Sequence, residues 1–210
     1  MLKWLFFIVV VRPLVLVVLG MNVRNRARLP AAGPAIVVAN HNSHLDTLVL
    51  MSLFPLCMLL RVRPVAAEEY FLRTRLLSWI ARQLIGIIPL RRTGFAHEDE
   101  LFKGLDDALA AGGIVIIYPE GTRGEPEQMT KFKSGIAHVA ERHPTVPVVP
   151  VYLHGLGKAL PKGDWLLVPF FCDVFVGEAM TWSGNRHDYM AGLESSMKSL
   201  ADEGRFTPWA

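Results

Sequence analysis

Short apolar runs alternate with longer stretches of mixed polarity along most of the chain. Runs rich in Val and Ile predict strands, and apolar residues at three- and four-residue spacing predict helices. The predicted strands cover 35–39, 62–67, 87–90, 114–117, 146–153 and 166–176, and the predicted helices cover 44–53, 69–84, 97–111, 134–142 and 187–203. Because strands and helices alternate, we expect an α/β fold with a single mixed, largely parallel sheet flanked by helices.

Two of these segments carry specific expectations. The run Ile114–Ile117 is apolar on both faces, which is typical of a buried parallel strand. The predicted strand 146–153 contains Pro147 and Pro150, which lack the N–H that a central strand needs. We therefore expect an edge strand or a bulge there.

The amino terminus is different, because Trp4–Leu19 is apolar except for Arg12 and Pro13. Sixteen helical residues reach about 24 Å, short of the ~30 Å hydrocarbon core of a bilayer. We expect two short helical pieces, bent at Pro13, that lie in one leaflet and are followed by three arginines at the headgroups: Arg24, Arg26 and Arg28. A secretory signal lacks a cleavage site here, and a buried core helix remains an alternative.

Composition narrows the class of protein. The chain has 210 residues, of which 51% are hydrophobic, so it suits one domain with a substantial core. A net charge of +3 does not favour nucleic-acid binding. Cys57 and Cys172 form no C-x-x-C pair, which gives little support to a disulfide scaffold or a thiolate zinc site and fits a reducing, cytosol-facing location.

A first polar cluster, Asn40–Asp46, directly follows the predicted strand 35–39. A carboxylate on one imidazole nitrogen fixes the tautomer and leaves the other nitrogen free to accept a proton, so His41 and Asp46 could form a general base. The same two residues could instead be a helix-capping pair. A third interpretation uses His41, His44 and Asp46 as metal ligands.

Two further clusters also follow predicted strands, where α/β sheets place their sites. Gly86–Arg92 ends in two arginines, of which either could lie at a membrane or sheet edge. Tyr118–Gly124 forms a Pro-Glu-Gly-Thr-Arg turn, followed by the basic residues Lys131 and Lys133 ahead of a helix. Such a turn could hold a phosphate, or it could be an ordinary turn with one Glu120–Arg123 ion pair.

Taken in chain order, the three clusters resemble the motifs of the glycerolipid acyltransferases, the family of the 1-acylglycerol-3-phosphate (lysophosphatidate) acyltransferases. The pattern N-H-x-S-x-x-D matches Asn40–Asp46, G-x-x-x-x-x-R matches Gly86–Arg92, and F-P-E-G-T-R-S matches Tyr118–Gly124. A fourth, proline-containing block matches Val146–Val151. Tyr118 and Gly124 stand where the family pattern has Phe and Ser, and Pro89 stands where many members have an aromatic residue.

The resemblance implies that His41, oriented by Asp46, removes the proton from a hydroxyl that attacks an acyl thioester. It implies that the acceptor phosphate is held by Arg92, Glu120, Gly121, Thr122 and Arg123, to which we add Lys131 and Lys133. The implied donor is acyl-CoA or acyl carrier protein, and the implied acceptor is a lysophospholipid, 1-acyl-sn-glycerol 3-phosphate, which would give phosphatidic acid. No metal or other cofactor is implied.

The implied location is the cytoplasmic face of a membrane, as a monotopic or peripheral protein, and the inner membrane in a bacterium. Residues 1–29 would be the membrane-associating helical segment and residues 30–210 the acyltransferase domain. Three alternatives stay open: transfer to another lysolipid, a metal-dependent hydrolase that uses His41, His44 and Asp46, and a non-catalytic lipid-binding module.

Overall fold

One sheet runs through the molecule. The computed structural model describes residues 2–71, 74–91, 98–160 and 168–206, and seven strands lie within them. They are β1 (Met21–Arg24), β2 (Ala35–Ala39), β3 (Val62–Ala67), β4 (Ile88–Leu90), β5 (Ile114–Ile117), β6 (Val148–His154) and β7 (Cys172–Val176). Their order is β1-β7-β6-β2-β5-β3-β4. The β6–β7 pair is antiparallel and the other neighbouring pairs are parallel, so the expected mixed, largely parallel sheet is confirmed.

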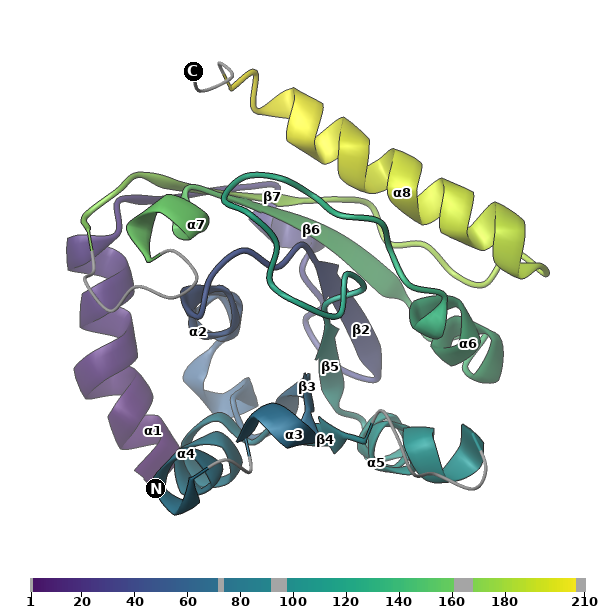
Figure 1. The fold of residues 1–210 in the computed structure, drawn as a ribbon, viewed down its shortest axis with the longest axis horizontal. Coiled ribbons are helices and arrows are strands. Elements are labelled where there is room, and N and C mark those ends of the chain that lie inside the picture. The colour runs from purple at the N-terminus through teal and green to yellow at the C-terminus, as the bar shows by residue number, and fades with distance from the viewer. Residues whose placement is uncertain (1, 72–73, 92–97, 161–167, 207–210) are drawn as a thin grey trace.

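Helices cover both faces of this sheet (Figure 1). The α-helices are α1 (Leu2–Phe6), α2 (Leu45–Ser52), α3 (Glu68–Phe71), α4 (Arg75–Trp79), α5 (Glu98–Ala110), α6 (Gly135–Arg142), α7 (Leu156–Ala159) and α8 (Arg186–Glu203). Short 3-10 turns, η3 (Arg26–Arg28) and η4 (Leu56–Met58), and π-helical turns, η1 (Phe7–Val11), η2 (Leu14–Val18) and η5 (Ile80–Ile85), complete the described elements.

The central strand β2 shows why both faces need a cover. Its five side chains are fully buried. Val37 and its alternate neighbours pack with the amino-terminal helix and α2, whereas Ile36 and Val38 pack with α5, α6 and α8. The same two-sided burial confirms the expectation for Ile114–Ile117, which is the adjacent strand β5.

The amino-terminal segment differs from the expected pair of bent pieces. The chain is helical from Leu2 to Val18, and Arg12 and Pro13 both keep right-handed helical angles. The fixed φ of proline is compatible with a helix. Pro13 has no N–H to donate, and the backbone next to it forms hydrogen bonds of the π type, such as Arg12 N–H to Phe7 C=O. The prediction of two separate pieces was therefore wrong.

This helical run has two faces of similar polarity but opposite burial. Four residues at four-residue spacing are at most 1% exposed and belong to the core: Phe7, Val11, Val15 and Leu19. The other face is exposed and equally apolar, with Leu16 at 71% and Val17 at 82%. The alternative of a buried core helix is therefore correct for one face of this helical segment and not for the other. No helix among the described residues has both the length and the apolar character needed to cross a membrane.

The segment after this helix contains a strand that the sequence did not predict. Met21–Arg24 forms β1 and pairs with β7 at the edge of the sheet. The neighbouring arginines bind the protein: Arg24 lies over the ring of Phe175, Arg26 donates to the carbonyl of Leu53, and Arg28 pairs with Glu178. The boundary at residue 29 between a membrane-associating segment and the acyltransferase domain remains a prediction.

Two other expectations needed correction. The predicted helix 69–84 is divided, because Thr74 adopts extended angles and its side chain accepts a hydrogen bond from Leu77 N–H as the cap of α4. The strand that contains Pro150 is not at an edge, since β6 lies between β7 and β2. The ladder to its antiparallel neighbour instead shifts by one residue, from Val151–Val176 to Val148–Met180, and this bulge accommodates Pro150.

Candidate active site

The register of the central strands brings two of the three polar clusters together. Val38 of β2 lies opposite Ile117 of β5 in a parallel ladder. The residues that follow these strands, His41 and Tyr118, therefore meet at the carboxyl edge of the sheet. Their rings stack with centroids 4.1 Å apart and planes at 18°. This is the position at which open α/β sheets bind ligands.

The structure joins His41 to Asp46. The distance from Nδ1 of His41 to Oδ2 of Asp46 is 2.8 Å. The same oxygen accepts hydrogen bonds from the N–H groups of Asn42 and Ser43, at 2.7 and 2.8 Å, and Asp46 is fully buried. The carboxylate thus both closes the turn before α2 and orients the imidazole, so the capping and general-base interpretations describe the same arrangement. Nε2 of His41 is hydrogen-bonded to none of the described residues.

Glu120 holds the main chain of His41. This residue is 2% exposed, and its Oε1 accepts from His41 N–H at 2.8 Å. Its other oxygen accepts from the N–H and the hydroxyl of Thr130, at 2.9 and 2.6 Å. Gly124 N–H in turn donates to the carbonyl of His41 at 2.9 Å. The loop that carries the Pro-Glu-Gly-Thr-Arg sequence is therefore bonded on both sides to the turn that carries the histidine.

Cationic side chains gather beside this loop. Gly121 has a positive φ of 72°, and a Cβ there would lie 3.0 Å from Nζ of Lys133, so glycine leaves room for the ammonium group. Arg123 Nη1 contacts Nε2 of His44. Burial, followed by the charges of Arg123 and His41, lowers the pKa of His44 against the opposing effect of Asp46. Thr122 and Lys131 are exposed next to these groups.

The second cluster lies further away. It contains β4, which is separated from β2 by β5 and β3, or about 14 Å at ~4.8 Å per strand spacing. Arg91 pairs with Glu68 at 3.1 Å. Arg92, the residue implied to hold phosphate, lies outside the described residues, as does part of the predicted strand 166–176.

The donors proposed for a metal do not converge. Nδ1 of His41 faces Asp46, whereas Nε2 of His44 faces the guanidinium of Arg123. In the part of the chain that the structure describes, no group of three or more His, Cys, Asp or Glu side chains is arranged to hold a metal ion. The arrangement therefore gives the metal-dependent hydrolase no geometric support.

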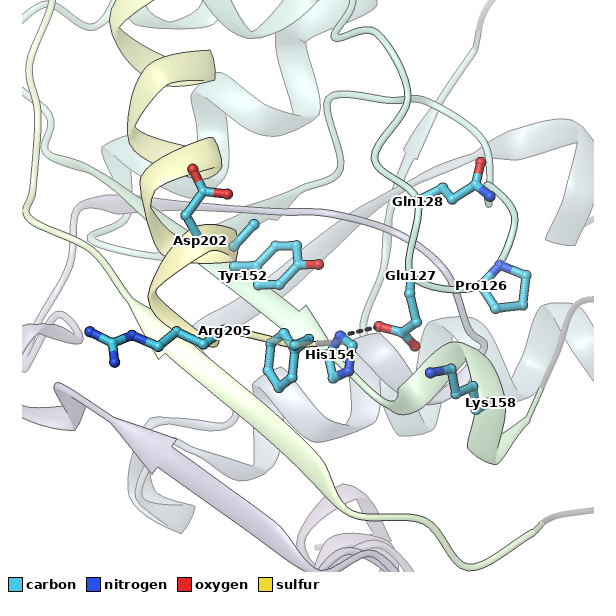
Figure 2. Close-up of a pocket in the computed structure, with 10 residues that line it drawn as sticks. Pro126, Glu127, Gln128, Tyr152, His154, Lys158, Asp202 and Arg205 are labelled. Carbon is cyan, nitrogen blue, oxygen red and sulfur yellow. Dashed lines mark ion pairs between the residues drawn. The ribbon is translucent and has the colours of Figure 1, made fainter. Parts of the chain in front are cut away.

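A cavity of about 500 Å³ lies between the loop that carries Glu127, the end of β6 and the end of α8, and it was not predicted (Figure 2). His154, at the end of β6, and Glu127, on the loop that follows Gly124, meet in it as an ion pair with 2.7 Å between Nδ1 and Oε2. Glu127 also accepts from Gly155 N–H at 3.0 Å, and its own N–H donates to the side chain of Asn42 at 3.1 Å. Sequence analysis did not predict these contacts, because they join segments more than 20 residues apart.

Fold and site together define an α/β protein with a histidine–carboxylate pair at the carboxyl edge of a mixed sheet. The family model described as Acyltransferase matches residues 20–154. That is more than half of the chain, and the chain belongs to this family. The expected family is therefore confirmed.

Curated relatives carry one recurring name. Over 144 residues the chain is 31% identical to the chloroplast 1-acyl-sn-glycerol-3-phosphate acyltransferase of Arabidopsis thaliana, a match covering 68% of this chain and 38% of that protein. Over 183 residues it is 29% identical to the 1-acyl-sn-glycerol-3-phosphate acyltransferase of Pseudomonas aeruginosa, covering 87% of this chain and 67% of that one. The chain spans only 38% and 40% of the length of the two chloroplast relatives, from Arabidopsis thaliana and Brassica napus.

A solved structure has the same fold. The crystal structure of the 1-acyl-sn-glycerophosphate acyltransferase from Thermotoga maritima matches 99% of this chain and 80% of that chain, with a TM-score of 0.77 and 22% sequence identity. The likeness extends over the amino-terminal helix as well as the sheet.

Proposed function

We propose that this protein transfers a fatty acyl group from an acyl thioester to the free hydroxyl of a lysophospholipid. The proposed acceptor is 1-acyl-sn-glycerol 3-phosphate, which gives phosphatidic acid, and the donor is acyl-CoA or acyl carrier protein. Membership of the Acyltransferase family and the names of the relatives support the reaction and the acceptor. The observation that carries the proposal is the 2.8 Å contact between His41 Nδ1 and Asp46.

In the proposed reaction, Nε2 of His41 removes the hydroxyl proton of the acceptor. The oxygen then bonds to the thioester carbonyl carbon, and the carbon–sulfur bond breaks. The departing thiolate takes the proton from the imidazolium, so His41 returns to its starting state. Asp46 keeps Nδ1 protonated and stabilises the imidazolium that forms between the two steps. A thioester already has a good leaving group, so no covalent enzyme intermediate is needed.

Acceptor binding is assigned to the cationic edge of the loop. Arg123, with Lys133 beside Gly121, would hold the phosphate, and Thr122 and Lys131 lie exposed nearby. Arg92 is retained as a phosphate ligand on the family pattern. The contacts of Glu120 suggest that it acts on binding indirectly, by holding the loop against His41.

The lipid substrates lead us to propose that the protein works at a membrane surface, on the cytoplasmic side where acyl thioesters are found, and on the inner membrane in a bacterium. The exposed apolar face of the amino-terminal helix supports this attachment. Since the three arginines after that helix already contact the protein, we assign the attachment chiefly to apolar side chains.

The decisive experiment measures free-thiol release from acyl-CoA and from acylated carrier protein across a panel of lysolipid acceptors. We expect His41→Ala and Asp46→Asn each to lower the rate by at least ~10²-fold in variants that remain folded, which is the lower range for loss of a general base. Near-wild-type rates in a folded His41→Ala variant would refute the mechanism. Lipid binding without thiol release would identify a non-catalytic module instead.

A further inference from the structure

Tyr118 contacts both halves of the histidine–carboxylate arrangement. Its ring stacks on His41, with centroids 4.1 Å apart and planes at 18°. Its hydroxyl lies 2.9 Å from Oγ1 of Thr47. Thr47 directly follows Asp46 in the first turn of α2. The side chain of the residue that directly follows β5 therefore stacks on the imidazole and is hydrogen-bonded to the helix turn that carries the carboxylate.

The stack constrains a motion that the carboxylate alone leaves open. The hydrogen bond to Asp46 fixes one point on the edge of the imidazole ring, about which the ring can still tilt. A flat aromatic surface against the ring face opposes this tilt, and tilting would move Nε2 away from a hydroxyl bound in line with it. Correct alignment of the base matters because misplacement by about 1 Å can cost ~10²-fold in rate.

The phenol itself is not suited to carry a proton in the reaction. Burial, and then the negative charge of Asp46, raise the pKa of Tyr118 well above its usual value, although the hydrogen bond with Thr47 opposes this shift. The hydroxyl therefore remains protonated at the pH values at which a histidine base would work. What it can supply is a fixed hydrogen bond to Thr47.

We infer that Tyr118 is a positioning residue for His41, acting through its ring stack and its hydroxyl bond to Thr47. This inference rests on the proposed function, in which His41 is the general base. It also gives a reason for the departure from the family pattern at this position: phenylalanine would keep the stack, and only tyrosine can also bond to Thr47.

The test compares Tyr118→Phe, Thr47→Val, their double variant and Tyr118→Leu in the thiol-release assay. The first two each remove the hydroxyl bond, and we expect kcat to fall by about two- to tenfold in each. The double variant should be no slower than the slower single variant, because both changes remove the same bond. Tyr118→Leu also loses the stack, so kcat should fall by about ten- to a hundredfold. KM for donor and acceptor should stay within about twofold.

Tyr189→Phe is the matched control, since it makes the same chemical change at a buried tyrosine of α8 in the core on the other face of the sheet. Its kcat should equal that of the wild type. If Tyr118→Phe and Thr47→Val also match this control while His41→Ala is inactive, the positioning role is wrong and the proposed function stands. Losses that add in the double variant, or that fall on KM alone, would likewise overturn the role. If folded His41→Ala stays active, the proposed function is wrong, and the positioning role of Tyr118 is then wrong as well.

Discussion

Arg123 and His44 face each other across the two loops of the site, and their contact bears on how an acceptor would bind. The guanidinium is bonded to a neutral imidazole nitrogen, which is a weaker partner than a phosphate group. A phosphate is therefore a stronger partner for this guanidinium than the imidazole is. Because Arg123 is placed on the acceptor and not on the thioester, its loss should affect the two substrates differently.

We expect Arg123→Gln to raise the acceptor KM by about tenfold or more, the equivalent of one lost charge-assisted hydrogen bond. The donor KM should change by less than about twofold. Steady-state kinetics with each substrate varied in turn checks this. Arg91→Gln is the control, since Arg91 is exposed, follows β4 and pairs with Glu68 at the start of α3. Equal rises in both KM values would contradict the phosphate role.

The residues of the site differ in how far the sequence could reveal them. His41 and Asp46 are five positions apart across one strand-to-helix turn, so their contact could be predicted from local geometry. The bond from Glu120 to His41 joins residues 79 positions apart and depends on the β2–β5 register. The sequence placed both residues at one edge of the sheet, but it could not show that the glutamate binds the main chain. The Glu127–His154 pair joins a loop to the end of β6, 27 positions further along the chain, and no sequence motif predicted it.

At the scale of elements, ion pairs fasten α5 to α6. Arg142 of α6 binds Asp99 and Asp106 of α5, each at 2.6 Å, and His143 binds the other oxygen of Asp106 at 2.7 Å. Burial raises the pKa of the Asp106 carboxyl, but the hydrogen bonds from Arg142 and His143 outweigh it, so the pKa lies below the usual 3.8. These interactions join α5 and α6, which cover the same face of the sheet.

A lowered carboxyl pKa makes this link depend on pH in one direction. The folded state holds the ionised form more firmly than the unfolded chain does, so the stabilisation is complete above about pH 3.8 and is lost as the pH falls through the folded pKa. Asp106→Asn should lower the melting temperature at pH 7, and the difference from wild type should shrink below about pH 3.8. Thermal unfolding at several pH values tests this, with the exposed neighbour Asp107→Asn as control. A difference that is unchanged or larger in acid would contradict the assignment.

The predicted elements were most accurate where local signals agreed with the tertiary structure. An apolar stripe and the pair Gly112-Gly113 predicted a helix over 97–111, and α5 covers Glu98–Ala110. The predictions from sequence were wrong where tertiary packing determines the secondary structure. The apolar residues of 69–84 fit one helix as well as two, and only the structure shows the break at Thr74. Proline is unfavourable in a regular central strand. Pro150 lies in a central strand, and a bulge accommodates it there, so the expected edge position is not needed.

For the whole molecule, the amino-terminal helix adds one apolar face to the core and leaves a second apolar face exposed. One face completes the core on its side of the sheet, with buried residues at a regular spacing of four: Phe7, Val11, Val15 and Leu19. Lys3 anchors the start of the helix, because its ammonium group donates to the carbonyls of Ile85 and Val62 at 2.7 and 3.4 Å. The helix is thereby held against the domain with its second apolar face outward, and this face has no described core to fill.

That outward face yields a prediction for the intact protein. Apolar side chains that enter the bilayer interface contribute about 1.5–3 kcal/mol each when fully buried, and a carboxylate there opposes insertion. The double variant Leu16→Glu/Val17→Glu should therefore bind phospholipid vesicles at least ~10-fold more weakly in a flotation assay, since these two side chains are 71% and 82% exposed and fill no core space. Its thermal unfolding and its thiol release with detergent-dispersed acceptor should match the wild type. Ser195→Glu/Ser199→Glu adds the same charge on the exposed side of α8, over the opposite face of the sheet, and should leave vesicle binding unchanged. If both double variants lose binding equally, net charge and not this face controls attachment; if neither does, the helix is not the membrane contact.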